Sequence, residues 1–279
     1  MTIGREIESG VEPAAEPRRR GFRARYAVVY EVDGPRVRLG VAWALLVSGA
    51  LAYGPARQPA LATLFGATVG WAAFQVVACW RPEHRLDRWV AGVGAASLPL
   101  ATAAVGVRGT GGALLAFVGV ALISARSTNR SWRSAATVAG RVVTSGVWVG
   151  VAGAAVMLTL RYEIGAVITL LVLVAAYEAS DYIVGSGASN RIEGPAAGII
   201  SVSVVTAVVA FLRVPPFEGL DAFAFGAAAA VLCAPGQLVG SALLPAADAH
   251  APALRRLDSL LLLAPAWAWA IGVLLVHRR

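Results

Sequence analysis

Residues 142–160 read VVTSGVWVGVAGAAVMLTL, an apolar stretch of 19 residues without a charged side chain. About 20 such residues form an α-helix long enough to cross the hydrocarbon core of a bilayer. Gly146, Gly150 and Gly153 lie within the stretch, and small residues of this kind let helix backbones approach closely in lipid. The stretch therefore predicts a membrane-spanning helix packed in a bundle.

Similar apolar stretches lie on both sides of this one. They cover residues 39–54, 59–79, 89–107, 111–125, 164–184, 195–212, 220–244 and 258–276. Because they are continuously apolar rather than alternating, and because backbone groups in lipid must be hydrogen-bonded within the protein, they favour helices over barrel strands. We predict an all-α, polytopic membrane bundle of nine helices, or of eight, since the fourth stretch is short and its boundary with the third is weak. Residues 39–160 are expected to be scaffold, and residues 161–279 to carry the polar site.

The composition agrees with a membrane protein and gives an orientation. Of 279 residues, 58% are hydrophobic and 14% charged, and the mean hydropathy is +0.69. All 24 basic residues are arginines; with nine spans and the N-terminus inside, 18 lie in cytoplasmic segments and six outside. This asymmetry follows the positive-inside rule. We therefore expect a multi-pass protein of a bacterial-type inner membrane with a cytoplasmic N-terminus.

Residues 1–38 are expected to form a flexible, arginine-rich tail that lies against anionic lipid headgroups, not a cleaved signal peptide. Nucleic acid is not an expected partner despite the net charge of +8, because the arginines are spread over loops and the aromatic residues lie within the spans. Two cysteines and three well-separated histidines do not predict a thiolate or histidine metal site.

Residues 250–259, HAPALRRLDS, form a polar run between the last two apolar stretches. Arg255, Arg256 and Asp258 place charge at the mouth of a membrane helix, where charge is costly, so one interpretation is a functional site. The other is a solvated cytoplasmic loop. Asp258 and Ser259 also fit an acidic first turn of the last helix, which the helix dipole favours.

A second polar group lies near the cytoplasmic end of the stretch 164–184. Spacings of three and four residues place Glu178, Asp181 and Tyr182 on one helix face. Carboxylates within a membrane are candidates for function, and a helix-end pair facing headgroups is the alternative. The glycine-rich residues 185–195 that follow either let the backbone approach a phosphate or form a simple interhelical turn.

A third polar group lies near the end of the eighth stretch. Cys233, Gln237 and Ser241 recur every four residues and share a helix face, with Gly236 and Gly240 beside them for close packing. Polar side chains of this kind bind a ligand or join helices.

These polar residues follow a known pattern. The C-terminal block offers, in order, Gly236-Gln237-Leu238, Ser241, His250, Leu254, Arg256, Asp258 and Ser259; the upstream block offers Glu178, Tyr182, Gly185, Glu193 and Gly194. Together the blocks resemble the integral-membrane phosphatidate cytidylyltransferases, also called CDP-diacylglycerol synthases. That family's signature runs Gly-Asp-Leu, Ser-x-x-Lys-Arg and His-Gly-Gly-x-x-Asp-Arg-x-Asp-Ser, after Asp-x-x-Ala-Tyr-x-x-Gly and Ser-Pro-x-Lys-Thr-x-Glu-Gly. The resemblance covers about residues 175–276.

The resemblance implies a membrane nucleotidyltransferase of phospholipid biosynthesis that joins phosphatidate to CTP. It implies catalytic roles for Asp258, Arg256 and Glu193, with Mg²⁺ held by Asp258 and Glu178. The first hypothesis is a divergent enzyme of this kind with a rearranged carboxylate set of Glu178, Glu193, Asp248 and Asp258. It implies substrate binding by Tyr182, Gly185, Gly194, Ser241, His250 and Ser259. The expected partners are a phosphatidate-like membrane lipid, CTP, the lipid bilayer and a second copy of the chain as a homodimer.

Departures from the family pattern leave alternatives open. The family's Lys-Arg, Lys-Thr and first Asp of Asp-Arg-x-Asp are replaced by Leu244-Pro245, Asn190-Arg191 and Arg255. A cation in place of a carboxylate opposes Mg²⁺ binding. One alternative is therefore a catalytically inactive relative that binds a lipid or a membrane partner. Another is a small transporter that uses Glu178 and Asp181 as proton-linked carboxylates.

Overall fold

The computed structural model describes residues 36–129, 131–188, 190, 192–246 and 249–278. These residues form nine α-helices and two short 3-10 helices, without a strand. The elements are α2 (Arg36–Ala52), η1 (Gly54–Ala56), α3 (Arg57–Trp80), α4 (Arg85–Val105), α5 (Val107–Thr128), α6 (Trp132–Tyr162), α7 (Ile164–Gly185), α8 (Glu193–Leu212), α9 (Asp221–Ala242), η2 (Leu254–Arg256) and α10 (Leu260–His277). Eight of the described α-helices, all except α2, are long and apolar enough to cross a membrane. The chain is a multi-pass helical membrane protein, as the sequence predicts; residues 1–35 of the predicted tail lie outside the described residues.

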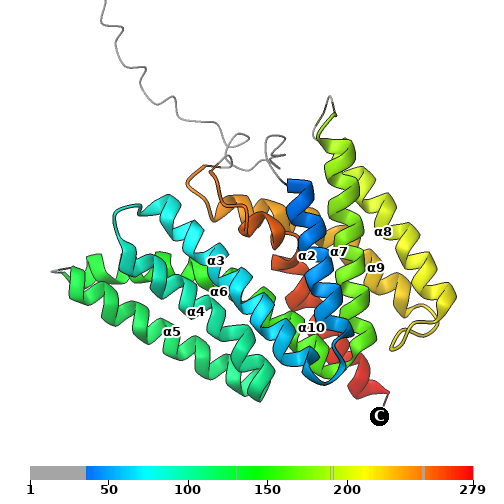
Figure 1. The fold of residues 1–279 in the computed structure, drawn as a ribbon, viewed down its shortest axis with the longest axis horizontal. Coiled ribbons are helices and arrows are strands. Elements are labelled where there is room, and N and C mark those ends of the chain that lie inside the picture. Colours follow the sequence, from blue (N-terminus) through cyan, green and yellow to red (C-terminus); the bar gives the residue numbers. More distant parts are fainter. Residues whose placement is uncertain (1–35, 130, 189, 191, 247–248, 279) are drawn as a thin grey trace, which may run out of the picture.

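The weak boundary between the third and fourth apolar stretches is a sharp break in the structure. α4 ends at Val105 and α5 begins at Val107, with Gly106 between them at a φ of 75°. Glycine adopts this conformation at little cost because it has no Cβ. The two helices pack side by side (Figure 1), and α5 has 22 residues, so the prediction of a short fourth helix was wrong.

α6 begins ten residues earlier than the apolar stretch predicts. The hydroxyl of Ser131 accepts a hydrogen bond of 3.2 Å from the backbone N–H of Ser134 and so caps the helix at Trp132. With 31 residues, α6 is about 46 Å long, and a bilayer core is about 30 Å thick. The first turns of α6, with Arg133 and Arg141, therefore lie at or beyond the membrane surface.

Glycines on α6 allow its close contacts with three N-terminal helices. A Cβ atom would lie 2.6 Å from Phe117 at Gly146, 2.5 Å from Leu98 at Gly150 and 2.9 Å from Val69 at Gly153. α6 thus packs directly on α5, α4 and α3, and it also packs on α10. This is the small-residue packing predicted from residues 142–160.

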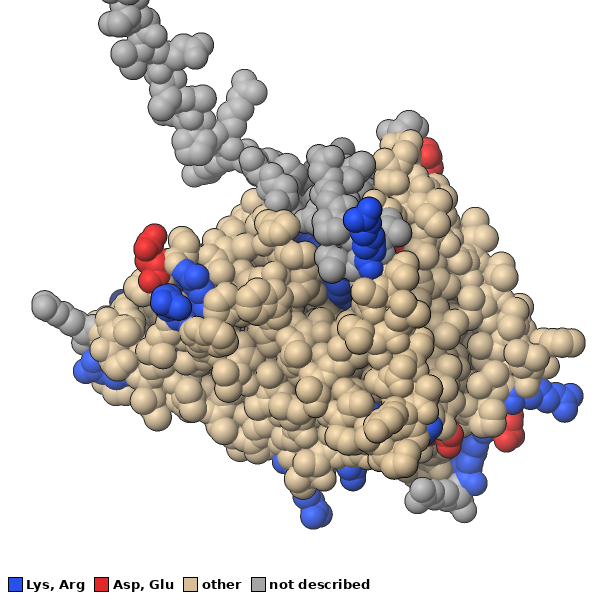
Figure 2. Space-filling view, viewed as in Figure 1, with Lys and Arg blue, Asp and Glu red and all other residues tan. Residues whose placement is uncertain are grey.

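The C-terminal helices form the other side of the bundle. α7 packs on α8, α8 on α9, and α9 on α10, which joins this group to α6 (Figure 1). The turn between α7 and α8 lies at the same edge of Figure 1 as the start of α2 and the chain between α9 and α10, whereas the C-terminus lies at the opposite edge. Charged side chains are seen mainly near the edges of the molecule in Figure 2, and its middle is uncharged.

Candidate functional site

Residues 249–259, between α9 and α10, pack onto the bundle. The side chains of Leu254 and Leu257 are completely buried, and Arg255, Asp258 and Ser259 are buried as well. His250 is exposed. The alternative of a solvated loop was therefore wrong for residues 254–259, although His250 at the start of the run faces outward.

α3 anchors the chain between α9 and α10 through its last two turns. The Gln75 side-chain oxygen accepts a hydrogen bond of 3.0 Å from the backbone N–H of Ala253. The indole N–H of Trp80 donates to the carbonyl of Leu243 at 2.7 Å. The Cys79 thiol lies 3.8 Å from the carbonyl of His250. The predicted scaffold region therefore helps to position the polar residues.

Arg255 lies at the centre of a buried polar network. Its Nη1 donates to Ser241 Oγ of α9 at 2.9 Å and lies 3.6 Å from Oδ2 of Asp258. The other oxygen of Asp258 accepts a hydrogen bond of 2.8 Å from the N–H of Ser259. α10 begins at Leu260, two residues later than predicted, so Asp258 precedes the helix and does not form its first turn.

Two of the three glycines of α9 make room for Asp258. A Cβ atom on Gly236 would lie 2.5 Å from the carbonyl oxygen of Asp258, and one on Gly240 would lie 2.7 Å from its Cβ. Only glycine permits this approach without movement of the segment. The close packing predicted beside Gln237 and Ser241 is confirmed, and its partner is Asp258.

α7 contributes a carboxylate to the same region. Asp181 is 2% exposed, and its Oδ2 accepts a hydrogen bond of 3.0 Å from the Gln237 amide N–H. Residues from α7, α9 and the segment before α10 are therefore brought to one part of the bundle. We call Asp181, Gln237, Ser241, Arg255 and Asp258 the polar cluster.

Arg256 lies beside the polar cluster, next in the chain to Arg255. A Cβ atom on Gly40 would lie 2.9 Å from Nη1 of Arg256, so this guanidinium lies against the start of α2. Arg256 is half-buried and His250 exposed. Tyr182, one turn after Glu178 on α7, is half-buried.

The α7–α8 turn holds the remaining predicted residues. Gly185 ends α7, and Gly194 is buried in the first turn of α8. Asn190 accepts hydrogen bonds from the backbone N–H groups of Ile192 and Glu193 at 2.9 and 3.1 Å, and it donates to the Glu193 carboxylate at 2.6 Å. These bonds are those of an interhelical turn. Arg191 of this turn lies outside the described residues.

The described residues do not by themselves fit a magnesium site. Mg²⁺ takes an octahedral set of oxygen ligands, and in the described part of the chain no three His, Cys, Asp or Glu side chains are grouped to hold a metal ion. Asp258 is paired with Arg255, and Asp181 with Gln237. Asp248, another predicted carboxylate, lies outside the described residues.

Three members of the polar cluster and one anchor lie outside the set of site residues that the family resemblance implies: Asp181, Gln237, Arg255 and Gln75. Asp181 and Gln237 carried a signal, since each shares a helix face with a predicted site residue. Gln75 is an amide within an apolar stretch, and such residues often hydrogen-bond across helices. For Arg255 the family pattern gave no guidance, because that position holds an aspartate in the family.

The helices and the polar cluster define a class: a multi-pass membrane protein with charged residues buried at one end of its helix bundle. No family model matches the chain, and no curated protein matches it.

Proposed function

We propose that this protein binds a phosphate-bearing membrane lipid of the phosphatidate class at the polar cluster. The observation that carries the proposal is the burial of Arg255 between Ser241 and Asp258, next to Arg256. Buried charge at a membrane helix end costs stability and is retained mainly where it serves a ligand or another function. A lipid phosphate is the anion that such a site meets at the membrane surface.

The position of the polar cluster suits a lipid headgroup. Asp181 lies four residues before the end of α7, which is about 6 Å along the helix. The cluster is therefore near the level where headgroups meet the hydrocarbon core. Arg256, half-buried and next in the chain to Arg255, supplies donors beside it, and guanidinium groups bind phosphate oxygens through paired, charge-assisted hydrogen bonds.

The geometry favours binding over metal-dependent transfer. Arg255 stands where the resembled family has a carboxylate, and its guanidinium lies 3.6 Å from Asp258, the best candidate metal ligand. A fixed positive charge at that distance disfavours a second cation on the same carboxylate. The proposal is therefore the inactive relative rather than the nucleotidyltransferase.

A soluble, short-chain phosphatidate tests this proposal with the purified, full-length protein in detergent. We expect saturable binding, with phosphatidylcholine of the same chain length binding much more weakly. Arg256→Gln should weaken phosphatidate binding about tenfold, because a charge-assisted hydrogen bond is lost. Arg133→Gln, at the exposed start of α6, is the matched control. Equal binding of the two lipids, or equal loss in both variants, would overturn the proposal.

The second candidate function is CDP-lipid synthesis, favoured by the contacts of Asp181 and Asp258 with the last turns of α9, at Gln237 and at Gly240. In that reaction a phosphate oxygen of phosphatidate would attack the α-phosphorus of CTP, and pyrophosphate would leave. Its test is formation of CDP-diacylglycerol from phosphatidate, CTP and Mg²⁺, abolished in Asp258→Asn. No product from any lipid phosphate, with an active control enzyme in the same detergent, removes this candidate.

We also propose that the protein lies in a bacterial-type inner membrane with a cytoplasmic N-terminus, which places the polar cluster at the inner leaflet. The distribution of 18 against six arginines supports this orientation. Labelling of single cysteines from each side of sealed vesicles would test it: Ser186→Cys should react from the cytoplasmic side and Gly219→Cys from the other.

A further inference from the structure

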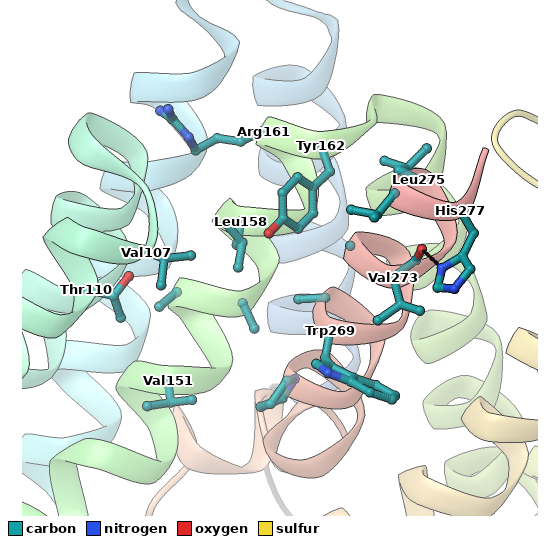
Figure 3. Close-up of a pocket in the computed structure, with 16 residues that line it drawn as sticks. Val107, Thr110, Val151, Leu158, Arg161, Tyr162, Trp269, Val273, Leu275 and His277 are labelled. Atoms are coloured by element: carbon teal, nitrogen blue, oxygen red, sulfur yellow. Dashed lines mark hydrogen bonds between the residues drawn. The ribbon is translucent and has the colours of Figure 1, made fainter. Parts of the chain in front are cut away.

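A second candidate site lies at the end of the bundle opposite the polar cluster. α5 and α10 both pack on α6 without extensive contact with each other, and the space between them is a groove of about 730 Å³ (Figure 3). Small-molecule sites have volumes of about 300–1,000 Å³. The groove is therefore large enough for a ligand.

The lining of the groove is apolar along its length and polar at one end. Ala154 and Ala155 of α6 and Gly272 of α10 are small residues that keep it open. Arg161 and Tyr162 lie at the end of α6, and the Tyr162 hydroxyl points into the space between α5 and α10 (Figure 3). The arrangement suits an amphipathic ligand with one apolar chain and a polar head.

The length of the groove matches one leaflet. Its lining extends along α6 from Val151 to Tyr162, eleven residues or about 17 Å. Half of a bilayer core is about 15 Å. Val107, Trp269 and Val276 of the walls are exposed, so the groove is bordered by surface that faces lipid tails in a membrane.

Arg161 gives the polar end its charge. Its Nη1 donates to the carbonyl of Ala103 at 2.7 Å, and none of the ion pairs among the described residues includes it. Its positive charge is therefore not neutralised by a described carboxylate. A cation at the membrane end of an apolar groove complements the phosphate of an anionic phospholipid.

We propose that the groove between α5, α6 and α10 holds one acyl chain of an anionic phospholipid from the leaflet opposite the polar cluster, with the lipid phosphate at Arg161. This site is independent of the proposed phosphatidate site, because it uses other residues and the other leaflet. Its failure would leave the function proposed for the polar cluster untouched.

Photochemical crosslinking in vesicles tests the proposal. The full-length protein is reconstituted with phosphatidylglycerol that carries a diazirine in one acyl chain, and the adducts are mapped after illumination. We expect adducts concentrated on the groove side of α6 and α10. Val151→Trp should fill the groove and remove these adducts, whereas Val172→Trp on the exposed face of α7 should leave them in place.

A second pair of variants tests the headgroup without filling the groove. Arg161→Gln should reduce the preference of the groove for phosphatidylglycerol over phosphatidylcholine about tenfold, because the charged contact is lost. Arg213→Gln, on the same side of the membrane at the end of α8, should leave the preference unchanged. Adducts spread evenly over all lipid-facing helices, or adducts that persist in Val151→Trp and show no headgroup preference, would overturn the proposal.

Discussion

At the scale of single residues, the pairing of Arg255 with Asp258 depends on the turns that precede α10. η2 covers Leu254–Arg256, and residues 257–259 continue as turns, with the N–H of Leu257 donating to the carbonyl of Leu254 and the N–H of Leu260 to the carbonyl of Leu257. These turns bring the guanidinium within 3.6 Å of the carboxylate. The sequence predicted charge at Arg255 and a role for Asp258 but not their pairing, because the apolar stretch predicts a helix that begins at Asp258 rather than at Leu260.

Removal of only one member of this pair should be strongly destabilising. Arg255→Met leaves Asp258 buried without its cation, at a cost of about 3–5 kcal/mol. The double variant Arg255→Met with Asp258→Leu removes both charges and should recover most of the loss. Unfolding in mixed detergent measures the two free energies. Equal loss in the single and the double variant would contradict a buried ion pair.

A methyl group on Gly240 should displace the segment before α10. Its Cβ would lie 2.7 Å from the Cβ of Asp258, and overpacking of this kind costs about 1–3 kcal/mol. Gly240→Ala should therefore lower the melting temperature. Gly119→Ala is the control, because a Cβ at Gly119 meets no atom within 4 Å. Similar melting temperatures for the two variants would contradict the close packing of Asp258 on Gly240 of α9.

At the scale of helices, the long apolar stretches of the sequence predicted every described α-helix, but the ends of several helices differ from the ends of the stretches. Residues 132–141 continue α6 although they include Arg133 and Arg141; the charges lower the hydropathy without ending the helix, because this part of α6 is at or beyond the membrane surface. α5 begins four residues early for a different reason. The change of direction between α4 and α5 takes place at the single residue Gly106, so α5 already begins at Val107.

The contact between α6 and α4 gives a prediction with a control on the same helix. A Cβ on Gly150 would lie 2.5 Å from a Leu98 methyl group and 3.0 Å from the backbone oxygen of Ala95, whereas a Cβ on Gly140 meets nothing within 4 Å. Gly150→Ala should destabilise the protein by about 1–3 kcal/mol, and Gly140→Ala should leave it as stable or slightly more stable. Thermal melting in detergent compares the pair. A greater loss for Gly140→Ala would contradict this packing.

At the scale of the whole molecule, contacts between distant parts of the chain build the polar cluster. Gln75 and Trp80 bind backbone groups 178 and 163 positions later. Local sequence patterns do not predict contacts between residues so far apart in the chain. The sequence therefore predicted which C-terminal residues share a polar helix face, but not that α3 anchors them. The family pattern has a carboxylate at the position of Arg255, so it did not predict a cation there.

Loss of the Gln75 anchor should therefore affect both stability and ligand binding. Gln75→Leu leaves the N–H of Ala253 without its acceptor, at a cost of about 1–3 kcal/mol, and should weaken phosphatidate binding at the polar cluster. Thr63→Val is the control, because the Thr63 hydroxyl bonds only within α3. Parallel measurements of melting and phosphatidate binding test this. If Gln75→Leu destabilises the protein but phosphatidate binding is unchanged, the Gln75 hydrogen bond is not needed to position the phosphatidate site.

Burial of residues 254–259 is the feature on which the polar cluster and its proposed ligand depend, and thiol accessibility measures it directly. In a background with Cys79→Ser and Cys233→Ser, single cysteines replace His250, Leu254 and Leu257, and the folded protein is treated with a polar maleimide. His250→Cys should react readily, and Leu254→Cys and Leu257→Cys only after denaturation. Equal reaction of all three in the folded protein would mean a solvated loop and no polar cluster.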